Sequence, residues 1–162
     1  MAFSRGKAEK AQAREFVTFQ PKESLPTLSK AKVTITNYLG GQYFLTVDEI
    51  LFAKDKVSLI EGKHSKNATL PSKGDIKDGL FKMILYCNLS EVTANGQKIK
   101  SEAVLCLTSS KLKGAINSSS TKKEIAHFFD ENNFSTSQRL LIETVIEEAN
   151  QNKFIVKIQF SK

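Results

Sequence analysis

The chain has 162 residues, enough for one domain with a substantial core, and we expect residues 1–162 to form a single domain. A hydrophobic content of 40% and a charged content of 25% are ordinary for a soluble protein, and no apolar run approaches a membrane span or a secretion signal, so we expect no membrane association and a cytoplasmic location. The net charge of +7 favours a polyanionic partner, because basic side chains release the counterions of a nucleic-acid backbone.

The first third of the chain predicts one helix followed by an antiparallel meander. Apolar residues at helical spacing predict a helix over residues 5–19, and two prolines favour a loop over residues 20–30. Alternating side chains then predict three strands, Lys32–Tyr38, Tyr43–Ala53 and Lys56–Lys63.

The last two of these strands form a hairpin that carries two carboxylates and a lysine near one end. Successive strand residues point to opposite faces, so Glu61 and Lys63 share a face. A two-residue turn puts Asp48 on that face, whereas a three-residue turn puts Glu49 there. Two-residue turns are the commonest, which favours Asp48 and leaves Glu49 as the alternative. The two registers with such a turn pair Lys54 with Val57 or Ala53 with Lys56.

Glu61 directly continues an apolar run, Val57–Ile60, that is typical of a strand buried on both faces. No turn residue separates the two. Because an unpaired carboxylate at the end of a buried strand is costly, we expect a metal ion or another cation beside Glu61.

The middle of the chain predicts a helix and a tight hairpin. Residues 64–74 form a loop, and Ser72 and Asp75 have capping-box spacing at the start of a helix that runs to about Leu89. Within residues 90–100, Asn-Gly predicts a two-residue hairpin turn. The expected buried stripe of the helix is Ile76, Leu80, Met83, Ile84 and Cys87.

The last third predicts a buried strand over Ala103–Thr108, a polar loop over 109–120 and two capped helices that start near Thr121 and Ser135. Residues 154–160 predict a final strand, half exposed at a sheet edge. The two cysteines, Cys87 and Cys106, lack metal-ligand spacing and are expected to be buried thiols.

The hairpin and its flanks resemble the PD-(D/E)XK nuclease superfamily, most closely the catalytic domain of type II restriction endonucleases. Asp48, twelve intervening residues and Glu61-Gly62-Lys63 are similar to the family motif, with Val47-Asp48 in place of its Pro-Asp. The resemblance covers roughly residues 43–90. It implies an α/β (α+β mixed) fold with a restriction-endonuclease-like core, a mixed central sheet flanked by helices in the order α-β-β-β-α-β. The first six predicted elements have the same order.

The resemblance also implies a magnesium-dependent endonuclease that hydrolyses the phosphodiester bonds of duplex DNA, as in a restriction system. Asp48 and Glu61 would bind Mg²⁺, with Glu49 as the alternative to Asp48 and the backbone carbonyl of Gly62 as a further ligand. Lys63 would position or activate the attacking water and stabilise developing negative charge.

Four lysines in predicted loops and turns are candidate contacts to double-stranded DNA: Lys66, Lys73, Lys98 and Lys111. Restriction-type nucleases often act as dimers and the chain is short for such an enzyme, so a second copy or a separate recognition subunit is a further expected partner. The alternatives to an enzyme are a non-catalytic basic module that binds nucleic acid and a subunit of a larger assembly.

Overall fold

The computed structural model describes residues 28–36, 42–53, 56–89, 92–94 and 97–162. Its strands are β1 (Leu28–Thr36), β2 (Gln42–Phe52), β3 (Lys56–Ser65), β4 (Thr93–Ala94), β5 (Gln97–Lys98), β6 (Lys100–Ser109), β7 (Ala115–Asn117) and β8 (Ile155–Phe160). Its helices are α2 (Lys73–Cys87), α3 (Lys122–Glu131) and α4 (Thr136–Asn152). The helix expected over residues 5–19 lies outside the described residues.

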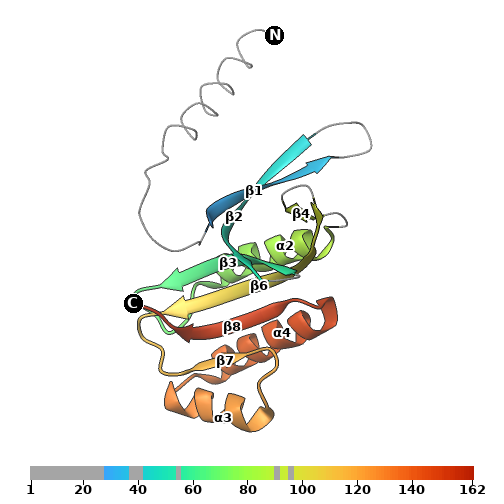
Figure 1. Cartoon of the computed structure of the whole chain (residues 1–162). Helices are drawn as coiled ribbons and strands as arrows, with labels where there is room; N and C mark the ends of the chain where they lie inside the picture. Colours follow the sequence, from blue (N-terminus) through green and yellow to red (C-terminus); the bar gives the residue numbers. More distant parts are fainter. Residues whose placement is uncertain (1–27, 37–41, 54–55, 90–91, 95–96) are drawn as a thin grey trace.

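Six strands form one mixed sheet in the order β1-β2-β3-β6-β8-β7, and α2 and α4 lie on the same face of it (Figure 1). β1, β2 and β3 form an antiparallel meander. The chain then crosses through α2 into β6, which is parallel to β3, and β8 adds a second parallel neighbour to β6. The predicted α/β class with a mixed sheet is therefore confirmed, and the described elements follow the predicted order β-β-β-α-β, with the small β4–β5 hairpin before the last strand.

The register of the β2–β3 hairpin is one of the two predicted for a two-residue turn. Glu49 pairs with Ile60 and Phe52 with Val57. The Ala53 N–H donates to the Lys56 carbonyl over 2.8 Å and closes the hairpin. Continued by one residue, this register sets Asp48 opposite Glu61, as the parity of the strands requires.

The buried stripe of α2 differs from the predicted one. Ile76, Gly79, Met83 and Tyr86 face the sheet, whereas Ile84 and Cys87 are exposed and Leu80 is half-buried. The predicted stripe of apolar residues did not include Gly79, yet this glycine is buried where the helix packs against the sheet. The expectation of two buried thiols is also wrong, because Cys87 is exposed and Cys106 is only half-buried.

Three expectations about the sheet need correction. β8 is an interior strand between β6 and β7, so it does not form the edge, and Phe154, Val156 and Ile158 are buried. The edge strand is β7, which lies inside the segment expected to be a polar loop; three residues are too few for a recognisable alternation. β1 likewise begins at Leu28, within the expected loop 20–30, because its pairing with β2 continues to that residue.

All three helices begin with the predicted cap. In each one the side chain of the N-cap residue accepts a hydrogen bond from the backbone N–H three residues later, and that third residue bonds back to the cap. The pairs are Ser72–Asp75, Thr121–Glu124 and Ser135–Gln138. These caps satisfy amide groups that a helix otherwise leaves without partners, and so fix where each helix starts.

Gly79 allows α2 to lie unusually close to the sheet. A Cβ atom at this position would come within 2.6 Å of Leu105 Cδ1 on β6 and 3.5 Å of the Lys63 side chain on β3. Glycine in the middle of a helix costs about 1 kcal/mol relative to alanine, so its place here is explained by packing and not by helix propensity.

We predict that Gly79→Ala destabilises the protein by about 1–3 kcal/mol, despite the better helix propensity of alanine, because the added methyl group overlaps Leu105. The free energy of unfolding, measured by urea denaturation, checks this.

Gly74→Ala is the matched control, since its Cβ would meet nothing nearer than Ser72 Oγ at 3.6 Å. It should be neutral or slightly stabilising. Equal stability of the two variants would show that α2 does not depend on close approach at Gly79.

Candidate functional site

Glu61 is a buried carboxylate held between two lysines. Its side chain is 1% exposed. Oε1 lies 3.0 Å from the Lys63 ammonium, and Oε2 accepts a hydrogen bond of 2.8 Å from the Lys82 ammonium. The chain itself therefore provides two cations beside Glu61, Lys63 and Lys82, where one was expected.

Strand and helix geometry bring these groups together. Glu61 and Lys63 are two residues apart on β3, so both side chains point to the face that α2 covers. On α2, Asp78 and Lys82 are one turn apart and share a face of the helix. Asp78 contacts Lys63 over 2.5 Å, and Lys82 contacts Glu61.

The four side chains form an ion-pair chain, in the order Asp78, Lys63, Glu61 and Lys82. The charges of these four side chains alternate in sign, and their sum is zero. Removing a single ion from water is expensive, and two hydrogen-bonded counter-ions offset much of that cost for Glu61. A carboxylate offers about four lone-pair positions, so two ammonium groups do not exhaust its capacity for ligands.

The ion-pair chain keeps its exposed end charged. Burial alone would lower the pKa of Lys63, but hydrogen bonds and charges from Asp78 and Glu61 outweigh it and raise that pKa above the usual lysine value. The hydrogen bond from Lys63, together with its charge, lowers the pKa of Asp78. At neutral pH, Lys63 is therefore an ammonium cation and Asp78 a carboxylate.

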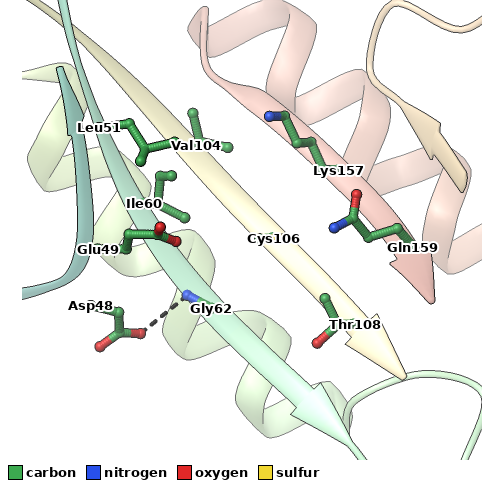
Figure 2. A pocket seen from close by; sticks show the side chains of 10 residues that line it. All are labelled: Asp48, Glu49, Leu51, Ile60, Gly62, Val104, Cys106, Thr108, Lys157 and Gln159. Carbon is green, nitrogen blue, oxygen red and sulfur yellow. Dashed lines mark hydrogen bonds between the residues drawn. The ribbon is translucent and has the colours of Figure 1, made fainter. Parts of the chain in front are cut away.

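The Asp48 side chain contacts the backbone of Gly62, the residue between Glu61 and Lys63. Its Oδ2 accepts a hydrogen bond of 3.1 Å from the Gly62 N–H, drawn as the dashed line in Figure 2. Asp48 is exposed. Asp48, Glu61, Gly62 and Lys63, which the sequence predicted as one site, thus occupy neighbouring positions at the end of the β2–β3 pairing.

Glu49 lies on the opposite face of the sheet. It pairs with Ile60 and lines an open pocket of about 370 Å³ together with Asp48 and Gly62, with Lys157 and Gln159 of β8 on the far side (Figure 2). Ile60 is the residue opposite Glu49, and the side chains of Ile60 and Glu61 point to opposite faces of β3. Of the two acids that the sequence left open, Asp48 is the one with a hydrogen bond to the residue between Glu61 and Lys63.

Tyr86 ties β2 to α2 close to Asp48. The tyrosine is buried, and its hydroxyl donates to the Thr46 carbonyl, two residues before Asp48, over 3.3 Å. Burial raises the pKa of Tyr86, and the negative charges of Glu61 and Asp48 raise it further. Both carboxylates therefore lie within electrostatic range of the same hydroxyl group.

Sequence reasoning missed Lys82, Asp78 and Tyr86 as members of the site. All three are on α2, and no local pattern shows which strand a helix will cover. The one available signal was the i, i+4 spacing of Asp78 and Lys82, which places an acid and a base on one face of the helix that follows β3.

The four candidate DNA contacts separate into two groups. Lys66 follows the end of β3 and Lys111 lies two residues after the end of β6, just beyond the last pair of these strands, Ser65 and Ser109, on the same edge of the sheet. Lys73 opens α2, directly after the loop that leaves that edge, and all three lysines are exposed. Lys98 precedes β6, at the other end of a strand that spans about 33 Å. The structure therefore brings Lys66, Lys73 and Lys111 together and sets Lys98 apart.

The oxygen atoms around Gly62 suit a hard divalent cation. Asp48, Glu61 and the Gly62 carbonyl offer oxygen ligands only, and Mg²⁺ prefers such ligands while it keeps several waters. Among the described residues, no cluster of three or more His, Cys, Asp or Glu side chains could hold a metal ion. The remaining ligands of a Mg²⁺ ion here would thus be water and substrate oxygens.

We predict that Lys82→Met destabilises the protein by about 1–3 kcal/mol, because Glu61 loses one of its two counter-ions while it stays buried. Breaking a fully buried pair costs more than this; Lys82 is 24% exposed and Lys63 remains, which moderates the effect. The free energy of unfolding at neutral pH is the measurement.

Lys77→Met, an exposed lysine on the same helix, is the control and should change stability by less than about 0.5 kcal/mol. Adding Glu61→Gln to Lys82→Met should recover part of the loss, since the unpaired charge is then gone. A Lys82→Met protein as stable as the wild type would contradict the role of Lys82 as a counter-ion.

No protein-family model, curated protein or solved structure matches the chain. None of the helices described is both long enough and apolar enough to cross a membrane. The function must therefore be argued from the ion-pair chain, the carboxylate at Gly62 and the basic edge of the sheet.

Proposed function

We propose that the protein is a magnesium-dependent endonuclease that hydrolyses phosphodiester bonds of duplex DNA, of the restriction type. The observation that carries the proposal is the neighbourhood of Gly62. A buried glutamate precedes this glycine, a protonated lysine follows it, and a second carboxylate accepts its N–H. Metal-dependent phosphodiester cleavage uses acidic metal ligands with a fixed cation beside them.

The order of the elements supports the proposal. An antiparallel meander, a helix and a strand parallel to the third follow one another, and the site lies at the junction of the second and third strands. A restriction-endonuclease-like core with the order α-β-β-β-α-β is the finer fold that we propose for the chain. The first helix of that order was predicted over residues 5–19, which lie outside the described residues.

In the proposed site, Asp48, Glu61 and the Gly62 carbonyl would hold Mg²⁺. When bound, this ion neutralises charge on the phosphoryl group and lowers the pKa of a bound water. Lys63 carries a raised pKa, so it acts as a cation: it orients the attacking water and stabilises negative charge that develops on the phosphoryl oxygens. Lys82 holds the Glu61 carboxylate from the other side.

The basic edge of the sheet supplies the contact to DNA. Lys66 follows the end of β3, Lys111 follows the end of β6, and Lys73 is the first residue of α2. These positions lie at the same edge of the sheet, and the proposed site lies on β3, which ends there. These ammonium groups would bind the phosphates of the duplex around the scissile bond. Cleavage of both strands would then require a second copy of the chain or a partner, and a separate recognition subunit could supply the sequence specificity.

A non-catalytic basic module is the second candidate. The observation in its favour is that Lys63 and Lys82 already neutralise Glu61, so the burial of this carboxylate needs no metal ion. Such a module would bind DNA through the same edge and leave it intact. Cleavage and binding must therefore be measured separately.

We predict that the purified protein cuts plasmid DNA in the presence of Mg²⁺ and not in EDTA. Lys63→Met should lower the cleavage rate by about 10²–10³-fold and retain DNA binding, because it removes one charged group that acts on the transition state and keeps the alkyl stem. Gel analysis of cleavage and fluorescence anisotropy for binding give the two readouts.

Lys123→Met, an exposed lysine on α3, is the matched control and should cut at the wild-type rate. Binding without cleavage by the wild-type protein would favour the non-catalytic module. Normal cleavage by Lys63→Met would overturn the role of Lys63. Sequencing of the ends produced would define the site of cleavage.

The choice between Asp48 and Glu49 has its own test. We predict that Asp48→Asn weakens Mg²⁺ binding at least about tenfold, since it removes one of two charged ligands, whereas Glu49→Gln, at the position that pairs with Ile60, leaves it unchanged. Isothermal titration calorimetry with Mg²⁺ measures this. The reverse result would make Glu49 the ligand, and no effect of either change would mean that the hairpin does not bind the ion.

A further inference from the structure

Asp78 is a member of the ion-pair chain to which the proposed reaction gives no task. It lies in the middle of α2, and its Oδ2 accepts a hydrogen bond of 2.5 Å from the Lys63 ammonium. Its side chain is 60% exposed. Water would satisfy such a carboxylate equally well, so the pairing does not serve the burial of Asp78.

For Lys63 the same contact has a larger consequence. A lysine side chain has four rotatable bonds, and its ammonium occupies a fixed place only where the surroundings hold it. Here it lies between two carboxylates that come from different elements, Glu61 of β3 and Asp78 of α2. The close approach of α2 at Gly79, beside the stem of Lys63, makes this bridge possible.

We propose that Asp78 is the positioning residue of Lys63: it keeps the ammonium at the site when a divalent cation shares the Glu61 carboxylate. This inference rests on the proposed function. A cation bound by Asp48 and Glu61 would repel the neighbouring ammonium and weaken its hold on Glu61. Asp78 is the partner of Lys63 that such a cation does not share, so it would retain Lys63 within reach of the phosphoryl group.

The first measurement is independent of cleavage. In protein labelled with ¹⁵N at the lysine side chains, NMR detects an ammonium group that carboxylates hold and protect from exchange. The Lys63 Nζ signal, identified by its absence in Lys63→Met, should be observed in the wild type without and with Mg²⁺. In Asp78→Asn it should vanish or broaden when Mg²⁺ is added.

The matched control is Asp130→Asn. Asp130 is also an exposed carboxylate, at 71%; it lies on α3, away from the site, and pairs with Arg139 of α4 over 3.0 Å. This variant should leave the Lys63 signal unchanged. A Lys63 signal that survives in Asp78→Asn with Mg²⁺ present would overturn the proposal.

The second measurement is cleavage kinetics. Asp78→Asn should lower kcat roughly tenfold to a hundredfold, as a small displacement of a catalytic group does, and change KM for DNA less than about twofold. Asp78→Glu should recover part of kcat, and Asp130→Asn should keep all of it. An unchanged kcat would overturn the proposal, and so would a raised kcat, because Asp78 would then withhold Lys63 from the reaction.

The two proposals fail in different ways. Wild-type protein that does not cleave DNA overturns the proposed function, and the Nζ signals then still decide whether Asp78 holds Lys63. Wild-type protein that cleaves, with an Asp78→Asn variant that cleaves equally well, overturns only the role of Asp78.

Discussion

The burial of the Glu61 carboxylate is the constraint on which this part of the molecule depends. A charge that is 1% exposed within a core strand must be matched by opposite charges, or the strand could not be buried there. Lys63 meets the requirement from the same strand, and Lys82 meets it from the helix above. The distance between β3 and α2 is thereby fixed by an electrostatic contact as much as by apolar packing.

Lys82 of α2 can pair with Glu61 of β3 only if the helix lies close to the strand. Gly79 permits this close approach because it has no side chain. Gly79 faces Leu105 and the stem of Lys63, one residue after Asp78 and three before Lys82. The ammonium and carboxylate groups are therefore oriented before any ligand arrives. Such preorganisation is what gives fixed charges their effect on a reaction, since no reorganisation is needed at the moment of bond breaking.

Local physics made most of the strands, caps and the hairpin register predictable. The parity of a two-residue turn was enough to set the register that pairs Glu49 with Ile60, and serine or threonine three residues before an acid or glutamine marked each helix start. What failed depends on which surfaces meet. The stripe of α2 was misassigned because its closest point is a glycine, and Lys82 and Asp78 became site residues only through the crossover that lays α2 over β3.

The short strand β7 has a consequence for how copies of the chain could associate. It covers the edge of β8 with only three residues, and α3 packs beside it. A long bare edge invites another strand to extend the sheet, with backbone hydrogen bonds that are indifferent to sequence. Three residues offer too few free backbone groups for that. This side of the sheet is thus closed to strand addition, and a companion chain that met the protein here would have to recognise side chains.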